Sequence, residues 1–262
     1  MTGIGLGLLA LALADLVAGG LAGEPRGPWH AVAGIALATA SAAAGAWLLG
    51  VAQAPILVIL VAAGGVCWLL PRCSSVRVER KSWLALGALA AYLALLLALS
   101  GEWTARLPGW FHVWFQGLPF TRSLGDGGDE KLVLVVGILL ALTATANGLV
   151  RAVLVVAGTP IGRSGERLRG GRFIGIIERF LIFGLAVSGE PAAAALIASA
   201  KSILRFPELS RVAHEPSPSD GRRAEGEPGA RVTDVDVVTE YFLLGSLVSW
   251  LAALAPVALL LG

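Results

Sequence analysis

The first twenty residues, MTGIGLGLLALALADLVAGG (1–20), are almost entirely apolar and carry one charged side chain, Asp15. A helix needs about 20 apolar residues to cross the hydrocarbon core of a bilayer. The stretch lacks the basic residues that open a secretory signal peptide, so we interpret it as a retained first span. The stretch therefore predicts that the chain is a helical membrane protein.

The remainder of the chain repeats this pattern. Of its 262 residues, 56% are hydrophobic and only 15% are charged, with a mean hydropathy of +0.78, whereas about a quarter of the residues of a soluble domain are charged. Long apolar runs predict an all-α fold, a polytopic transmembrane helix bundle. We expect about eight spans, at 3–23, 29–49, 52–70, 83–100, 132–157, 173–189, 191–206 and 239–261.

Basic residues gather in alternate connections between these spans. Segments 71–81, 162–172 and 201–231 hold most of the Lys and Arg residues, and segments 50–53 and 188–190 hold none. Short loops rich in Lys and Arg stay on the cytoplasmic side of a membrane. With eight spans, both termini then lie outside, and we expect a multi-pass protein of the cell inner (plasma) membrane.

The spans divide into two predicted halves. Residues 1–131 form an amino-terminal four-span half that ends in an outer segment, 101–131, and residues 132–262 form a carboxy-terminal four-span half. Aromatic residues in the outer segment are typical of a helix at the membrane interface, which serves as an anchor or as a lid over an outer-facing cavity. Segment 207–236 is rich in Pro, Gly, Ser and charge, which predicts a mobile cytoplasmic loop available to a cytoplasmic protein partner.

Polar and charged side chains within the spans are the candidates for function, because a charge at the bilayer centre costs about 2.5–3.5 kcal/mol. Spans five to eight carry them toward the inner leaflet, and cations outnumber carboxylates. We therefore predict a cytoplasm-facing cavity of positive potential, suited to a phosphate or carboxylate ligand such as an anionic membrane lipid. Glu178 is the candidate catalytic acid or base, and the candidate ligand-binding residues are Asn147, Arg151, Arg172, Arg179, Lys201, Ser202, Arg205 and Glu240.

Each candidate also has a structural interpretation. Thr143, Asn147 and Arg151 recur every four residues and line one stripe of a continuous helix, which either lines a site or joins helices. Glu178 either serves a ligand or pairs with Lys201 or Arg205 to hold helices together. Basic residues near helix ends also set orientation. Asp15 is a candidate because a lone intramembrane carboxylate is often functional, although nearby glycines equally mark a packed interface.

Metal and nucleic-acid chemistry are not expected. The cysteines Cys67 and Cys73 and the three histidines are scattered, and their spacing matches no metal-binding motif. We expect no metal, no other cofactor and no nucleic-acid partner.

The carboxy-terminal third contains the motifs GGRFIGIIERFLI, AKSILRF and EYFLLGS. They resemble the GRxIGxxER, AKSxxRF and EYxxxG[ST] helices of an uncharacterised family of bacterial polytopic integral membrane proteins. The resemblance implies a bacterial inner membrane protein and implies no activity. It marks as motif positions Arg172, Glu178, Arg179, Lys201, Arg205 and Glu240.

Three functions are compatible with these features. The first is a membrane enzyme acting on a phosphorylated lipid, with Glu178 as acid or base and arginines holding the phosphate. The second is a carrier or receptor for a small anion, and the third is a structural or assembly protein without a ligand. The paired aspartates of metal-dependent phosphoryl transfer are missing from the sequence. The sequence favours an anion-handling site without assigning turnover.

Overall fold

The computed structural model describes residues 1–22, 25–73, 78–103, 105, 107–117, 128–158, 171–197, 199–200 and 230–261. Within these residues the regular structure is helical, apart from one isolated antiparallel bridge between Val51 and Ala105. The chain divides into two compact units, unit 1 (Met1–Val156) and unit 2 (Ala157–Gly262). The prediction of an all-helical chain is confirmed for the described residues.

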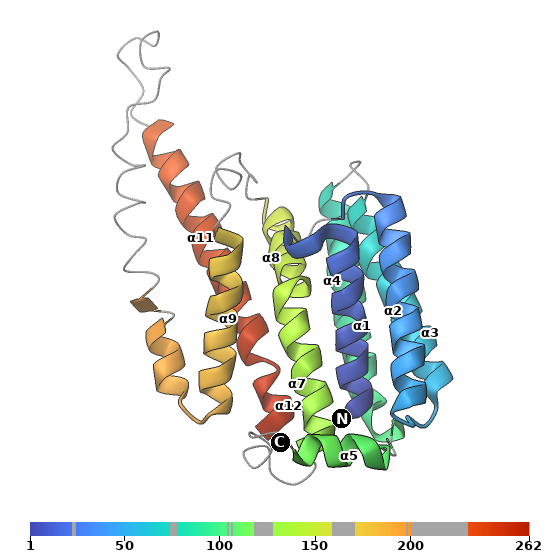
Figure 1. Ribbon diagram of the computed structural model, residues 1–262. Coiled ribbons are helices and arrows are strands. Elements are labelled where there is room, and N and C mark those ends of the chain that lie inside the picture. Colours follow the sequence, from blue (N-terminus) through green and yellow to red (C-terminus); the bar gives the residue numbers. More distant parts are fainter. Residues whose placement is uncertain are drawn as a thin grey trace. The chain divides into compact units, whose positions relative to one another are not determined.

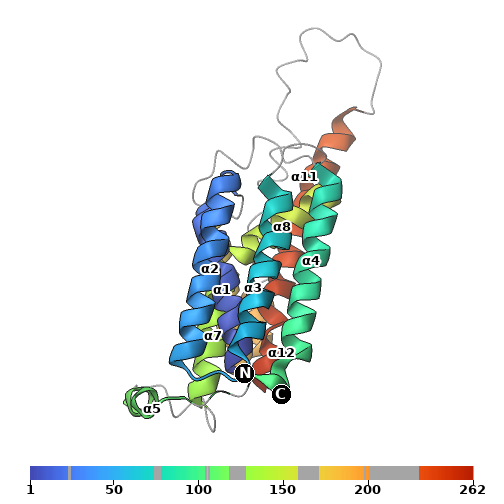
Figure 2. The same cartoon turned by 90° about the vertical axis from the view of Figure 1, so that its right-hand side faces the viewer.

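Unit 1 is a bundle of helices that run alternately in opposite directions (Figure 1). A further helix, α5, lies across one end of this bundle rather than along it (Figures 1 and 2). The elements of unit 1 are α1 (Thr2–Gly19), η1 (Gly20–Ala22), α2 (Pro28–Leu48), α3 (Ala54–Leu69), η2 (Leu70–Cys73), α4 (Val78–Ala98), η3 (Ser100–Glu102), α5 (Gly109–Gln116), α7 (Gly128–Thr143) and α8 (Thr145–Val156).

Helix α1 is the centre of unit 1. It packs against α2, α3 and α7. Of its 18 residues 72% are buried, compared with 28% of an 18-residue stretch of α2. Glycines allow this packing: a Cβ atom added at Gly5 would lie 2.6 Å from the backbone of Val133, and one added at Gly137 would meet the backbone of Gly5. Small residues let membrane helices approach this closely. The enclosed position of α1 also allows it to carry a charge away from lipid.

The expected span at 132–157 consists of two helices. Helices α7 and α8 meet at Ala144 with a bend of 44°. The hydroxyl of Thr143 donates a hydrogen bond to the carbonyl of Leu140 at 2.6 Å. A threonine that bonds back onto its own helix weakens the regular backbone ladder and favours a bend. Residues on the two sides of Ala144 therefore do not share one straight helical face.

Unit 2 contains α9 (Gly171–Val187), a helical stretch at 191–197, α11 (Ala230–Leu254) and α12 (Val257–Leu261). Helix α9 packs against α11 and α12. Helix α11 begins at Ala230, whereas the sequence predicted a loop as far as residue 236. The segment ARVTDVDVV contains no Pro or Gly that would interrupt a helix. The remainder of the predicted loop, 207–229, lies outside the described residues.

The division into units differs from the predicted boundary at residues 131/132. Helices α7 and α8 follow that boundary in the sequence, yet α7 packs on α1, and α8 packs on α4. These contacts place both helices in unit 1. The boundary between the two compact units therefore follows helix packing.

Five helices in the described part of the chain are each long and apolar enough to cross a membrane: Thr2–Gly19, Pro28–Leu48, Ala54–Cys73, Arg80–Ala98 and Phe242–Leu261. The bent pair α7–α8 makes a sixth if it crosses as one span. The described residues thus support five or six of the eight predicted spans. Helix α9 has 17 residues, fewer than the roughly 20 of a typical span, and only 191–197 and 199–200 of the predicted span 191–206 are described.

The distribution of polar residues is inverted relative to a soluble protein. Asp15, Glu178 and Arg179 are buried, whereas Trp29 and Trp47, near the two ends of α2, are each 82% exposed. The two tryptophans are 18 residues apart, about 27 Å along a helix, which is close to the ~30 Å thickness of a hydrocarbon core. Tryptophan favours the two interfaces of a membrane. These features are those of a membrane-embedded protein.

Candidate functional site

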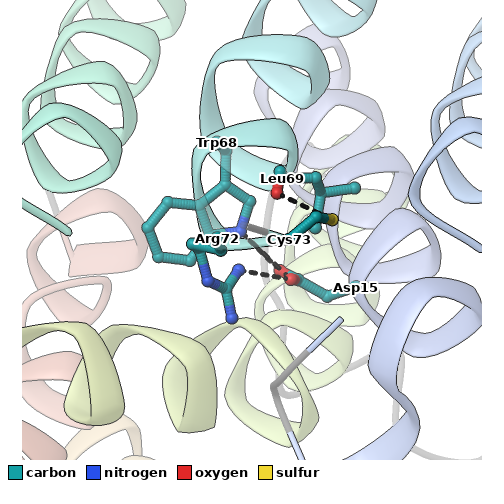
Figure 3. A network of polar contacts seen from close by, with 5 residues as sticks. All are labelled: Asp15, Trp68, Leu69, Arg72 and Cys73. Carbon is teal, nitrogen blue, oxygen red and sulfur yellow. Dashed lines mark hydrogen bonds and ion pairs between the residues drawn. The ribbon is translucent and has the colours of Figure 1, made fainter. Parts of the chain in front are cut away.

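Asp15 is the centre of a buried polar cluster in unit 1 (Figure 3). Its carboxylate accepts the indole N–H of Trp68, with Nε1 lying 3.1 Å from Oδ1 and 2.9 Å from Oδ2. Arg72 donates from Nη1 to Oδ1 at 3.0 Å and forms an ion pair with the carboxylate. The guanidinium carbon of Arg72 also lies 4.1 Å from the centroid of the Trp68 ring, within the range of a cation–π contact. The three side chains thus bind one another pairwise.

The end of α3 positions both partners of Asp15. Trp68 and Arg72 are four residues apart, so they share a face where α3 continues into η2. The thiol of Cys73 donates a hydrogen bond to the carbonyl of Leu69 at 3.3 Å and so helps to hold this turn. Helix α1 presents Asp15 to the same face from one turn before its own end.

Helix α8 completes the surroundings of the cluster. A Cβ atom added at Gly148 would lie 2.5 Å from Nη2 of Arg72, so the guanidinium occupies the space that any larger residue would need. One residue earlier, Asn147 donates from Nδ2 to the carbonyl of Leu21 at 2.8 Å. This bond joins α8 to the turn that follows α1.

The arrangement of the cluster is suited to holding helices together. The side chains of Asp15 and Arg72 are only 1% and 8% exposed. A charge that is withdrawn from water needs an opposite charge and hydrogen bonds to remain ionised. Each charge here receives both from a residue of another element. An internal ion pair thus joins α1 to η2, and the indole hydrogen bond joins α1 to α3.

A second pair of buried charges lies on α9 in unit 2. Glu178 is 6% exposed and Arg179 is 2% exposed. Oε1 of Glu178 accepts the indole N–H of Trp250, on α11, at 2.8 Å. Nε of Arg179 donates to the carbonyl of Gly175 one turn earlier, at 2.9 Å. Both charged side chains therefore lie on the side of α9 that packs against other helices. A hydrogen bond from Trp250 on α11 orients the carboxylate of Glu178.

The opposite side of α9 is apolar and exposed. Phe173, Ile174 and Ile177 are 58%, 56% and 58% exposed. Lipid-facing sides of membrane helices have this character, and intramembrane charges almost always face protein or water instead. On α11, the buried polar residues Ser246 and Ser249 lie within one turn of Trp250. Polar groups are thus concentrated on the inner sides of both helices.

The structure distributes the predicted site residues over both units. Asn147 and Arg151 lie on α8 in unit 1, whereas Arg172, Glu178 and Arg179 lie on α9 in unit 2. Among these, Glu178 and Arg179 are adjacent and buried on the side of α9 that contacts other helices.

Several predicted positions are not covered. Lys201, Ser202 and Arg205 lie outside the described residues, so the expected pairing of Glu178 with one of these cations lies there too. Glu240 is within α11, but its side chain, like that of Arg172, is outside the described part of the chain.

The stripe expected from Thr143 through Asn147 to Arg151 is interrupted. The prediction required one continuous helix, but α7 ends at Thr143 and α8 starts at Thr145. In addition, the hydroxyl of Thr143 binds its own helix, and the amide of Asn147 binds the turn after α1. Both side chains are therefore hydrogen-bonded to backbone carbonyls within unit 1.

Sequence reasoning did not identify Trp68, Arg72 or Trp250 as members of polar clusters. Arg72 was assigned to a basic loop that sets orientation, yet its guanidinium is buried against Asp15. A signal was present: Trp68 and Arg72 are spaced by one helical turn at the end of an apolar run. Tryptophan carries an N–H that needs an acceptor when it is buried, so an intramembrane carboxylate and a tryptophan are natural partners.

The described residues contain no group of three or more His, Cys, Asp or Glu side chains placed to hold a metal ion. Comparison with known proteins adds no assignment. No protein-family profile matches the chain, and no curated protein and no solved structure shows significant similarity to it.

Proposed function

We propose that this chain is a multi-pass protein of the bacterial inner membrane that binds an anionic ligand at a positively charged intramembrane site on α9. The ligand class is a phosphate or carboxylate group, carried by a membrane lipid or by a small soluble anion. The observation that carries the proposal is Arg179, a guanidinium that is 2% exposed on a helix with an apolar outer face.

The spacing of the charges on α9 supports this proposal. Arg172 and Arg179 are seven residues apart, which places them on nearly the same side of a helix and about 10 Å apart along its axis. Arginine presents a planar set of donors that matches phosphate and carboxylate groups. Glu178 has one carboxylate oxygen bound to Trp250, and in this proposal it accepts or donates a proton or fixes the orientation of the arginine.

The proposed topology adds α9 and the segment 191–206 to the six candidate spans, which gives eight spans with both termini outside and the basic loops in the cytoplasm. In unit 1, Arg26 lies between η1 and α2, and Arg80 and Lys81 lie in the first turn of α4. The start of α4 is at the same end of the bundle as the end of α1 (Figure 1). Positively charged connections favour the cytoplasmic side. A cysteine introduced by Ser217→Cys should resist impermeant thiol reagents added to intact cells and react after the cells are opened. Labelling of intact cells would contradict this orientation.

The motifs of the carboxy-terminal third resemble those of an uncharacterised family of bacterial polytopic membrane proteins. This resemblance supports the proposal that the chain belongs to that family and lies in a bacterial inner membrane. It adds no activity to the proposal. The basic segment 162–172 runs into the first residues of α9, so a headgroup on the cytoplasmic side would meet positive charge before it reaches Arg179.

A structural or assembly role is the second candidate, and the Asp15 cluster favours it. That cluster uses a carboxylate, an indole and a guanidinium to join helices, and the bond between Glu178 and Trp250 has the same form. In this alternative the charges of α9 hold unit 2 together, and segment 207–229 offers a contact to a cytoplasmic protein.

Native mass spectrometry of the purified protein separates the two candidates. We expect the wild type to retain an anionic lipid or small anion, Arg179→Gln and Glu178→Gln to lose it, and the control Glu190→Gln to keep it. Glu190 is an exposed carboxylate in the turn after α9. Its neutralisation raises the net charge by the same amount as Glu178→Gln, without touching the buried pair. A wild type without a bound anion, or an Arg179→Gln variant that keeps the anion but has a lower melting temperature, would favour the structural role.

A further inference from the structure

Helix α5 presents an apolar surface at the end of unit 1 where α1 begins. It lies across the bundle rather than along it (Figures 1 and 2). Phe111 and Phe115 are buried, whereas Trp110, Val113 and Trp114 are 55%, 71% and 52% exposed. The ring of Phe111 contacts those of Trp110 and Trp114, with centroids 5.7 and 5.6 Å apart. The three rings line a shallow apolar hollow.

The segment before α5 is attached to unit 1 at several points. Ala105 forms an antiparallel bridge with Val51, and Nε2 of Gln53 donates to Oε2 of Glu102 at 2.9 Å. Trp103 is 2% exposed and lies in the space beside Gly3, where an added Cβ atom would be 2.7 Å from its ring. With this attachment and the burial of its two phenylalanines, α5 is held as a fixed part of the bundle end and is unsuited to swing as a lid.

The sequence of α5 divides its circumference into three faces. Successive residues are about 100° apart around a helix, so Phe111 and Phe115 define the face that is buried. Trp110 and Trp114 lie about 100° to one side of it, and His112 and Gln116 lie about 100° to the other.

The two outer faces differ in chemistry. One carries indole rings, and the other carries an imidazole and an amide, which lie 2.7 Å apart at Nε2 of His112 and Nε2 of Gln116. A helix lying in a membrane interface needs this combination, an apolar side toward the acyl chains and a polar side toward water.

We propose that α5 is a fixed anchor in the membrane interface, with its Trp110–Trp114 edge inserted at the boundary between headgroups and acyl chains. This inference is independent of the anion site on α9. A further exposed tryptophan on another helix supports lipid as the occupant of the exposed edge. Trp47 is 82% exposed in the last turn of α2, and α2 ends at the end of unit 1 where α5 lies (Figure 1). Tryptophan concentrates at the interface level of a membrane.

The charge of α5 specifies the kind of lipid surface. The segment GWFHVWFQ contains no Lys, Arg, Asp or Glu. Attraction to anionic headgroups requires basic residues, so the contact is made with neutral or zwitterionic lipid and is governed by apolar area. Binding of the α5 edge is therefore expected to be insensitive to salt.

Spin labels at two positions of the full-length protein test this inference. Trp114→Cys and Gln116→Cys are each introduced after Cys67→Ala and Cys73→Ala, and the nitroxide-labelled proteins are placed in nanodiscs of zwitterionic lipid. Power saturation compares collisions with oxygen, which concentrates in lipid, and with a water-soluble nickel complex. We expect the depth parameter to be positive at position 114 and negative at position 116. Trp110→Cys, on the same edge as Trp114, should give the same sign as position 114 and replaces it if that variant does not fold.

Equal accessibility of both edges to the nickel complex would overturn the proposal, because α5 would then lie in water. Spin–spin broadening between labels at position 114 would also overturn it, because the edge would then contact a second copy of the chain. A depth parameter at position 114 that changed sign with salt concentration would contradict the neutral contact.

Discussion

Neutralising Asp15 tests whether the buried cluster in unit 1 is an ion pair that stabilises the fold. Asp15→Asn keeps the size of the side chain and one oxygen that accepts the indole N–H of Trp68, but it removes the negative charge beside Arg72. Since the two charged side chains are 1% and 8% exposed, water does not compensate the remaining guanidinium. Removing one partner of a buried ion pair costs about 3–5 kcal/mol. A single hydrogen bond between membrane helices averages about 0.6 kcal/mol.

The difference between these magnitudes makes the test decisive. Trp68→Phe retains an aromatic ring near Arg72 and removes the indole N–H donor, so we expect it to cost about 1–2 kcal/mol at most. The double variant Asp15→Asn/Arg72→Met removes both charges and should be more stable than Asp15→Asn alone, because no unneutralised charge remains buried. Reversible unfolding in mixed detergent and SDS micelles measures all three variants against the wild type. If Asp15→Asn costs no more than Trp68→Phe, the ion pair does not stabilise the fold and the reasoning is refuted.

Two further predictions concern helix packing. Gly148→Ala places a methyl group within 2.5 Å of Nη2 of Arg72 and should destabilise unit 1 by about 1–3 kcal/mol. The control Gly87→Ala, where nothing lies within 4 Å, should be neutral or stabilising by up to about 1 kcal/mol. Equal effects of the two variants in the same unfolding assay would argue against the close contact. Trp250→Phe leaves Oε1 of Glu178 without its indole donor, so the variant should unfold at a lower SDS fraction, and an unchanged midpoint would mean that this bond contributes nothing measurable.

Several features of the fold were predictable because they depend on properties of one segment at a time. Hydropathy summed over a window located the helices at 2–19, 28–48 and 54–69 closely, since transfer of apolar side chains into lipid is nearly additive along a helix. The same reasoning placed Glu178 and Arg179 on the protein-facing side of α9, because charges facing lipid are costly.

The features that sequence reasoning missed depend on the meeting of distant segments. Asp15 and Arg72 are 57 positions apart, and Arg72 had an equally good explanation as a basic loop residue. The bend at Ala144 breaks the expected stripe, and the packing of α7 on α1 places α7 in unit 1.

The sequence by itself determined that this is a helical membrane protein, where most of its helices lie and which side chains must avoid lipid. Only the tertiary structure decided which partner each buried charge binds, where one expected span is broken and which helices form a unit. The physical reason is that the cost of exposing a charge to lipid belongs to the residue itself. The bond that removes this cost belongs to a pair, and its geometry exists only once the helices have packed.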